Sequence, residues 1–236
     1  MVSSWGLAQN AHFWDGIETF DGPTDKNPLL AAQIDYYFDQ LVSPLPDSIT
    51  LEISRLITRI DSNKDLRDFF LWKLLDKYQH PSYMTQDQVF VFLFDQYFSQ
   101  LDIKDLNEIN RAIIQEKADQ LRKLTLFKTA PDFQLNDSLD LHSVESEYTV
   151  LFFYDHDCEV CHQEMQDLDS VVIVHPEITV LSIDMNTNDV SKDILYNLYD
   201  IETTPLIYVL DREKHIIAKK IQAKQIPIIL KAQTTE

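Results

Sequence analysis

The two cysteines of the chain stand close together, and they are the residues with the clearest capacity for chemistry. Cys158 and Cys161 lie in the stretch "DHDCEVCHQEM" and are followed directly by His162. Cys-x-x-Cys is the spacing of a redox dithiol or of half a zinc site, and Cys-x-x-Cys-His is the attachment signature of a c-type haem. The elements around the cysteines decide among these chemistries.

The residues on either side of the cysteines predict a strand before them and a helix after them. Residues 148–154, "YTVLFFY", have the β-branched and aromatic content of a buried strand, and residues 158–174 have helical character. This order places Cys158 at a helix N-terminus, where free backbone N–H groups and the helix dipole favour a thiolate. Cys161 lies one turn inside the helix. We therefore expect Cys158 to be the nucleophile and Cys161 the resolving thiol.

A proline ahead of a later strand supplies the second part of the predicted site. Thr204 and Pro205 precede the apolar run "LIYVLD", where a proline loses a ladder hydrogen bond. A cis bond between Thr204 and Pro205 beside the dithiol would explain this proline, because it would present the backbone of Thr204 to an extended substrate. Both residues are therefore predicted to bind substrate.

Residues 128–236 have the alternation of an α/β domain. A short extended piece, "APDFQL", is followed by buried strands in "YTVLFFY", "EITVLSIDM", "LIYVLD" and "KHIIAKKI". Helices are predicted after the cysteines, in "SKDILYNLYDI" and in the closing "AKQIPIILKAQ". The order β-α-β-α-β-β-α predicts a mixed central sheet flanked by helices.

Residues 1–127 are predicted to form a separate all-α domain. Apolar residues recur with helical spacing in five segments: "NPLLAAQIDYYFDQLV", "DSITLEISRLITRID", "NKDLRDFFLWKLLDKYQ", "TQDQVFVFLFDQYFSQ" and "DLNEINRAIIQEKADQLRKL". The boundary between the two domains is placed where the last of these helices stops, at "KTAP".

The C-terminal half resembles a thioredoxin-like domain of the TlpA/ResA type. The matching stretches, in family order, are "APDFQL", "VLFFYDHDCEVCHQEM", "VLSIDMN", "TTPLIYVLD" and "KHIIAKKI". The resemblance implies a thioredoxin fold in which Cys158 and Cys161 are the redox pair and Pro205 is the cis-proline. Glu164 stands where the ResA-like group has an acidic residue, one turn beyond Cys161, and would shuttle protons for that thiol. The alternative is an exposed helix carboxylate.

The implied activity is thiol–disulfide exchange on protein substrates, served by an upstream electron donor and needing no cofactor. The helical half is similar to a domain that precedes such modules in exported proteins of anaerobic gut bacteria, so an exported, periplasm-like location is expected. The opening residues, "MVSSWGLAQNA", lack a complete secretory signal. Membrane or lipoprotein association is expected only through a signal that this chain does not contain.

The formal net charge of −19 argues against nucleic-acid binding, because phosphates would be repelled at long range. Between Asp137 and Asp211 the only basic residue is Lys192. We interpret this excess of acids as a solvated, solubilising surface. Apolar runs such as "TVLFF" are far too short to cross a bilayer.

Several residues depart from the family pattern around the dithiol. His156 and Asp157 replace the usual Trp before the first cysteine, and Glu159-Val160 replaces the familiar Gly-Pro or Pro-Pro between the cysteines. We name the acids that crowd the nucleophile, Asp155, Asp157, Glu159 and Glu164, the acidic collar. Like charges disfavour a thiolate, so we predict a pair that is more reducing than a DsbA-type oxidant.

Two further departures concern the fold. Phe152 stands at the position of the buried aspartate of thioredoxin proper, six residues before Cys158. Glycine is absent after Gly22, so turns that relatives build with glycine are expected to use Asn, Asp or His.

Metal and haem chemistry fit the sequence less well than a dithiol does. Haem attachment needs a haem-enclosing fold and a second axial ligand, for which Met165 is too near in sequence. A structural zinc site wants four ligands, and no second cysteine pair exists. Cys158 and Cys161 with His162 or His175 could still bind a metal in a copper-chaperone-like manner. We predict no metal.

Two other functions remain as alternatives. Peroxidase chemistry of the peroxiredoxin kind is disfavoured, because Asp155 occupies the position of the threonine expected three residues before the reactive cysteine. A non-catalytic protein is the stronger alternative, with the thioredoxin-like half as a binding scaffold, the cysteines as a staple and the helical half as an interaction surface.

Overall fold

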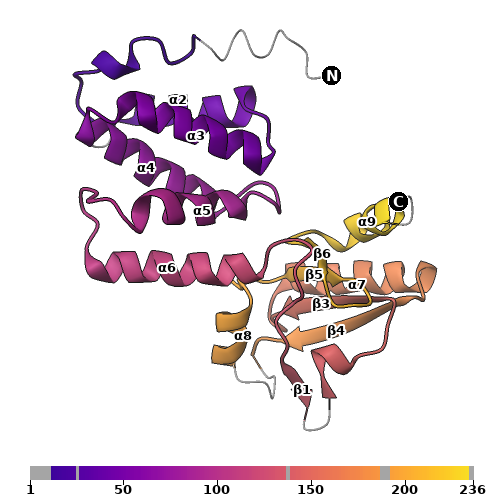
Figure 1. The fold of residues 1–236 in the computed structure, drawn as a ribbon. Helices are drawn as coiled ribbons and strands as arrows, with labels where there is room; N and C mark the ends of the chain where they lie inside the picture. Colours follow the sequence, from indigo (N-terminus) through magenta and orange to yellow (C-terminus); the bar gives the residue numbers. More distant parts are fainter. Residues whose placement is uncertain (1–11, 25–26, 137–138, 187–191, 234–236) are drawn as a thin grey trace. The chain divides into compact units, whose positions relative to one another are not determined.

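The computed structural model describes residues 12–24, 27–136, 139–186 and 192–233, which fall into two compact units (Figure 1). The units are Met1–Asp119 and Gln120–Glu236, whereas the sequence pattern placed the boundary between residues 127 and 128. The last turn of the helix α6, Glu108–Lys123, accounts for the difference. Gln120 of that turn donates hydrogen bonds to the backbone oxygens of Tyr196 and Tyr199, so it belongs with the C-terminal unit.

The N-terminal unit is helical, as predicted. Its α-helices are α2 (Pro28–Tyr36), α3 (Pro46–Ile60), α4 (Lys64–Gln79), α5 (Asp87–Leu93) and most of α6. Side-chain caps begin two of them: Asn27 Oδ1 accepts from the N–H of Leu30 at 3.1 Å, and Asn63 Oδ1 from that of Leu66 at 3.2 Å. Within the described residues, no helix has the length and apolar character to cross a membrane.

Short helical turns complete this unit. A 3₁₀ turn, η1 (Ile17–Thr19), precedes α2, and the π-helical turns η2 (Tyr37–Leu41) and η3 (Phe94–Phe98) continue α2 and α5. The two long helices predicted around these turns therefore change their hydrogen-bond pattern in the last five residues. The set of side chains that share one face of the helix changes at these turns, because a π turn adds a residue to the helical repeat.

The C-terminal unit is built on a mixed four-stranded sheet in the order β4-β3-β5-β6, which confirms the predicted sheet. β3 (Tyr148–Tyr154) pairs in parallel with β4 (Ile178–Asp184), and antiparallel with β5 (Leu206–Leu210). β6 (Ile216–Lys219) pairs antiparallel with β5. The predicted extended piece forms a separate small hairpin of β1 (Gln134–Asn136) and β2 (Leu139–Asp140).

Helices cover both faces of this sheet (Figure 1). α8 (Lys192–Leu198) packs on one face, where Leu195 and Tyr199 share a buried core with Leu151 and Phe153 of β3. Because strand side chains alternate, Val150 and the buried Phe152 point to the opposite face. On that face lie α7 (Glu159–Val174), the turn η5 (Ala223–Gln225) and α9 (Ile226–Gln233).

The buried hydroxyl of Tyr199 should make this unit lose stability in alkali. The hydroxyl donates to the backbone oxygen of Pro131 at 2.5 Å, and burial, followed by the charge of Asp132, raises the pKa of Tyr199. In the unfolded chain a tyrosine ionises near about pH 10. Above that pH the unfolded state binds fewer protons than the folded state, so the free energy of unfolding falls as pH rises, by up to about 1.4 kcal/mol per pH unit.

Urea unfolding at pH 8 and pH 11 measures this loss. The Tyr199→Phe variant should show a smaller decrease between the two pH values than the wild type shows. Equal decreases in the two proteins would contradict the assignment to Tyr199.

After Gly22 the turns of the described residues are built without glycine, but not from the residue types predicted. Backbone φ is positive at Asp105, Phe127, Lys214 and Lys220, with values of 64°, 65°, 64° and 54°. Asp105 fits the expectation of Asn, Asp or His, and the expectation is wrong for the other three. Long-range backbone bonds hold them instead: the N–H of Phe127 donates to Ile216 and that of Lys220 to Ile207, each at 2.8 Å.

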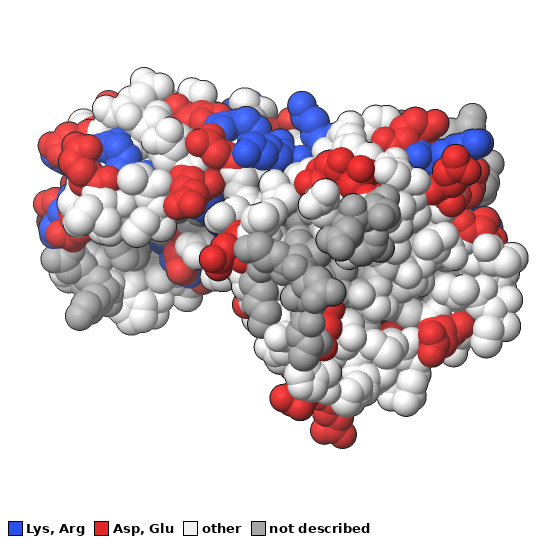
Figure 2. Space-filling view, turned by 90° about the horizontal axis from the view of Figure 1, so that it is seen from below, with Lys and Arg blue, Asp and Glu red and all other residues white. Residues whose placement is uncertain are grey.

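Acidic side chains are spread over the surface rather than gathered in one patch, on the face seen in Figure 2. This distribution is the one expected for a solvated, solubilising surface.

Candidate active site: a dithiol at the start of α7

The first cysteine occupies the N-cap of α7, as predicted. Cys158 has extended backbone geometry, and its Sγ accepts a hydrogen bond from the N–H of Cys161 at 3.2 Å. The N–H of Cys158 in turn donates to the backbone oxygen of Asp155 at 3.1 Å. A sulfur in this position faces the unpaired N–H groups and the positive end of the helix dipole. Such groups are the donors that a helix N-terminus offers to a sulfur atom.

The second cysteine differs from the first in its exposure. Cys161 is fully buried one turn into α7, whereas Cys158 is half-buried. Burial raises the pKa of the Cys161 thiol, and hydrogen bonds with the backbone of Asp155 and the side chain of Thr204 oppose that rise. Cys161 is thus kept protonated and away from solvent. An accessible thiol beside a protected one suits an attacking and a resolving cysteine.

The segment before β5 lies at the same edge of the sheet as the dithiol. The pairing of Phe153 with Leu206 sets the start of β5 beside the end of β3, from which the chain runs on to Cys158. The peptide bond between Thr204 and Pro205 is cis, which confirms the prediction for that bond. The Thr204 side chain lies near enough to Cys161 to lower the pKa of that thiol, so the fold brings the cis-proline segment to the dithiol.

Glu164 has a partner that the sequence pattern did not show. Its half-buried carboxylate accepts a hydrogen bond from the N–H of Ala223, the first residue of η5. Asp167, three residues further along α7, forms an ion pair at 2.9 Å with Lys224, the residue after Ala223. These two contacts fasten α7 to η5. Proton transfer between Glu164 and Cys161 stays a prediction. The hydrogen bond to Ala223 gives Glu164 a structural role as well.

Two substitutions should separate the tasks of Glu164. Glu164→Ala leaves the N–H of Ala223 without its acceptor, so we expect a loss of about 1–3 kcal/mol in the free energy of unfolding. Glu164→Gln keeps an acceptor oxygen and should keep most of the stability. Urea unfolding of the three proteins measures both effects, and equal stability of the Ala variant and the wild type would contradict the structural task. A slower exchange reaction in the Gln variant, at unchanged stability, would identify proton transfer.

A histidine and an aspartate at the same edge were not predicted as a pair. His156 Nδ1 lies 3.3 Å from Asp184 Oδ2, and its Nε2 lies 3.5 Å from Asp157 Oδ2. The Asp184 side chain is only 14% exposed, at the end of β4. In the sequence His156 stands out as a departure from the family pattern, with no partner indicated. The signal for the pair lies in the sheet register, which sets Tyr154 opposite Asp184.

The collar residue Asp155 has a structural use as well. Its Oδ1 accepts from the N–H of Asp157 at 2.9 Å, which shapes the loop between β3 and α7. Asp157 and Glu159, by contrast, are exposed on either side of Cys158. The collar therefore consists of two carboxylates engaged with backbone N–H groups, Asp155 and Glu164, and two that face solvent.

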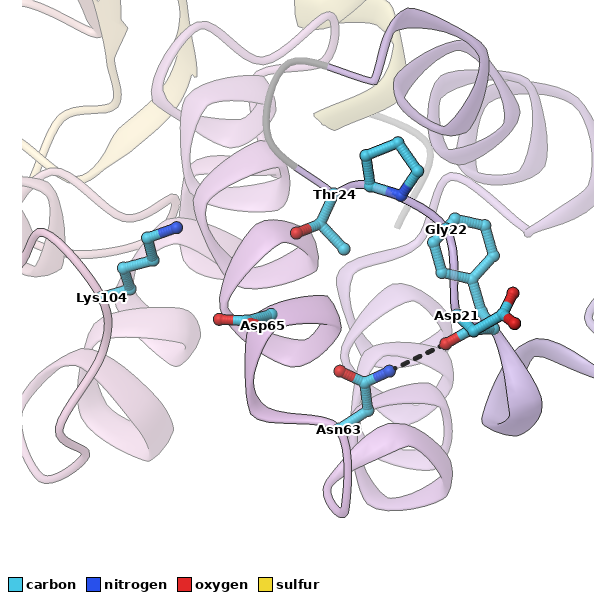
Figure 3. A pocket seen from close by; sticks show the side chains of 8 residues that line it. Asp21, Gly22, Thr24, Asn63, Asp65 and Lys104 are labelled. Carbon is cyan, nitrogen blue, oxygen red and sulfur yellow. Dashed lines mark hydrogen bonds between the residues drawn. The ribbon is translucent and has the colours of Figure 1, made fainter.

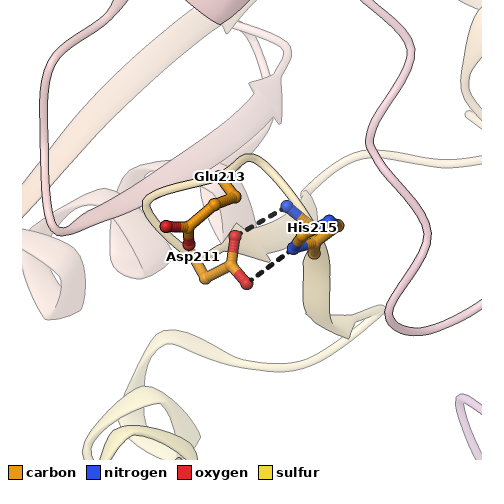
Figure 4. A group of neighbouring side chains, drawn as sticks. All are labelled: Asp211, Glu213 and His215. Carbon is orange, nitrogen blue, oxygen red and sulfur yellow. Dashed lines mark hydrogen bonds and ion pairs between the residues drawn. The ribbon is translucent and has the colours of Figure 1, made fainter.

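A second group of polar side chains lies at the other end of β5. Asp211, Glu213 and His215 in the turn between β5 and β6 offer ligand atoms within 4.8 Å of one another (Figure 4). Asp211 accepts two hydrogen bonds from His215, from the backbone N–H at 2.7 Å and from Nδ1 at 3.0 Å. These bonds close the hairpin turn, so the cluster has a structural explanation.

The N-terminal unit has a polar pocket of about 310 Å³ beside the start of α4 (Figure 3). Asp21, Asn63, Asp65 and Lys104 contribute to its lining. Asn63 is engaged with the surrounding chain, because its Nδ2 donates to the backbone oxygen of Phe20 at 3.0 Å. The pocket lies in the unit that does not contain the dithiol.

Comparison with known proteins gives one family match and several similar solved structures. Residues 127–230 match the AhpC/TSA family. A solved thioredoxin-like protein from Bacteroides caccae is similar over 98% of this chain and 94% of its own, at 17% identity and a TM-score of 0.74. No match was found among curated proteins.

Two further solved structures cover about half of this chain. A domain of a possible thiol-disulfide isomerase from Cytophaga hutchinsonii is 28% identical over 48% of this chain and 98% of its own, with a TM-score of 0.40. A thiol:disulfide interchange protein from a Bacteroides species is 16% identical over 48% of this chain and 93% of its own, with a TM-score of 0.42.

The likeness to the Bacteroides caccae protein establishes the fold, because it extends over nearly the whole of both chains. It confirms the predicted thioredoxin-like fold and the helical region in front of it. The chain therefore consists of a helical unit followed by a thioredoxin-like domain, and residues 127–230 of it match the AhpC/TSA family.

Proposed function

We propose that the protein is a thiol–disulfide oxidoreductase that reduces or exchanges disulfides of protein substrates through Cys158 and Cys161. The observation that carries this proposal is the unequal environment of the two thiols. Cys158 is accessible at the N-terminus of α7, while Cys161 is buried within reach of it and beside Thr204. This arrangement provides an attacking thiolate and a protected second thiol in one site.

The reaction proceeds in two exchange steps. In the first, the Cys158 thiolate attacks one sulfur of a substrate disulfide, forming a mixed disulfide and releasing the other substrate sulfur as a thiolate. In the second, Cys161 loses its proton and attacks Cys158 Sγ, which releases the remaining substrate thiolate. The substrate gains two electrons and two protons, and the protein is left with a Cys158–Cys161 disulfide.

The proposed direction in the cell is reduction, followed by recharging of the dithiol by an upstream electron donor of the dithiol class. The acidic collar supports this direction. Exposed carboxylates at Asp157 and Glu159 destabilise a neighbouring thiolate, which favours the oxidised form of the pair and makes the reduced form a stronger reductant. An exported, periplasm-like location belongs to the same proposal and is supported by the resemblance of the sequence to TlpA/ResA-type domains.

Reduction of insulin by the protein, with dithiothreitol as the electron donor, tests the function. The wild type should accelerate precipitation of the insulin B chain over dithiothreitol alone, and Cys158→Ser should not. Equal inactivity of wild type and Cys158→Ser on insulin and on scrambled ribonuclease would contradict the proposal. That result would favour the scaffold alternative, in which the cysteines only hold the fold.

A further inference from the structure

We propose that the preferred substrates are polypeptides in which Lys or Arg flanks the disulfide-bonded cysteine. This inference rests on the proposed function and adds the chemical class of the substrate. It is drawn from the charges and apolar surface immediately around Cys158.

Exposed carboxylates stand on both sides of the nucleophile along the chain. Asp157, with 84% of its side chain exposed, and Glu159, also exposed, lie on either side of Cys158. A polypeptide bound at Cys158 therefore meets a carboxylate from the loop before α7 and another from the first turn of that helix.

The basic side chains near this edge are already engaged with other acids. Lys224 pairs with Asp167 at 2.9 Å, and Lys220 pairs with Asp200 at 2.6 Å. Lys192, the one base between Asp137 and Asp211, has a side chain outside the described part of the structure. His156 bridges Asp157 and Asp184, one imidazole between two carboxylates. Within the described residues the collar thus keeps a negative excess that a cationic substrate would offset.

A second observation points to a polypeptide rather than a small molecule. Val160, between the two cysteines, has 64% of its surface exposed directly beside the nucleophile. An exposed apolar side chain next to a half-buried sulfur favours a substrate that brings side chains of its own into contact. Glutathione disulfide has no apolar side chain that could contact Val160. It also carries carboxylates, which the collar would repel.

The expected effect is large at low salt and small at high salt. Complementary charge around a binding site raises association rates by 10- to 1,000-fold. Screening shortens the range of the field to about 10 Å at 0.1 M ionic strength and about 3 Å at 1 M. We expect a preference for the basic substrate of at least about 10-fold at low salt, falling to about 3-fold or less near 1 M.

Three peptides with one internal disulfide test the inference. They are identical except that each cysteine is flanked by Lys, by Ser or by Glu. Rates of reduction by the pre-reduced wild-type protein should follow the order Lys, Ser, Glu at low salt and converge at high salt. Asp157→Asn/Glu159→Gln should bring the Lys and Glu peptides several-fold closer together.

The matched control is Glu145→Gln/Glu147→Gln. It removes the same charge from exposed positions ahead of the first residue of β3, at the opposite end of that strand from the dithiol, and should keep the wild-type preference. Equal rates for the Lys and Glu peptides, or a preference that the control lowers as much as the collar variant does, would overturn the inference while leaving the proposed function intact. Failure to reduce any of the three peptides would overturn both.

Discussion

Replacing Cys161 with serine should convert the protein into a trap that stays covalently joined to its substrate. The accessible Cys158 can still attack a disulfide, but no second thiol remains to displace the substrate. In the wild type the buried Cys161 lies one helical turn from Cys158, so on the proposed reaction we expect the mixed disulfide to be short-lived. We expect the adduct to rise from an undetectable to a major fraction of the protein.

Non-reducing electrophoresis and mass spectrometry after incubation with oxidised protein substrates measure the adduct. Dithiothreitol should release it. Cys158→Ser serves as the matched control, because it keeps one buried thiol and removes the accessible one. An adduct of similar yield in Cys158→Ser would contradict the assignment of Cys158 as the nucleophile, and the absence of any adduct in Cys161→Ser would contradict the two-step reaction.

The second large expected effect concerns the reduction potential of the pair. A DsbA-type oxidant has a potential of about −120 mV because its reduced form is stabilised. Here the exposed carboxylates of Asp157 and Glu159 oppose the stabilising N–H groups at the start of α7. We expect a potential far below that of the oxidant, toward the range of about −200 to −270 mV that glutaredoxins and thioredoxin occupy.

Equilibration with glutathione or dithiothreitol redox buffers gives this potential. Asp157→Asn/Glu159→Gln should raise it by on the order of 10–20 mV, since the groups are exposed and solvent screens them. The control pair Glu145→Gln/Glu147→Gln should leave it unchanged. A wild-type potential near that of the oxidant would contradict the assignment of the protein as a reductase.

The strands β3, β5 and β6 could be predicted closely because burial on both faces leaves a continuous apolar signal. β3 matches the predicted "YTVLFFY" residue for residue. The boundary between the units shows where this signal ends. The last turn of α6 reads as a continuation of the helix in front of it, but Gln120 of that turn bonds to Tyr196 and Tyr199 of the following unit. Local periodicity does not carry that information.

The candidate site was predictable where its parts are close in sequence or tied to a strand end. The cysteines and the Thr204–Pro205 bond belong to that class. The partners of Glu164 and His156 do not: the N–H of Ala223 lies 59 residues beyond Glu164, and Asp184 comes from the neighbouring strand. Both contacts depend on how the sheet and the last helices pack. Residue spacing alone therefore identified the side chains of the site but could not predict the partners of Glu164 and His156.

The turns made from Phe127, Lys214 and Lys220 have a consequence for the unfolded chain. Left-handed backbone costs about 1–2 kcal/mol at each residue that carries a side chain, and this cost lowers the free energy of unfolding. Average usage would place about 15 glycines in the 214 residues after Gly22, where this chain has none. A residue with a Cβ has fewer backbone conformations in the unfolded chain than glycine has. Where the folded backbone suits that residue, this lower entropy stabilises the folded state by about 0.4–1 kcal/mol per position. The chain with these strained turns thus has an unfolded state of lower conformational entropy, so it loses less entropy when it folds.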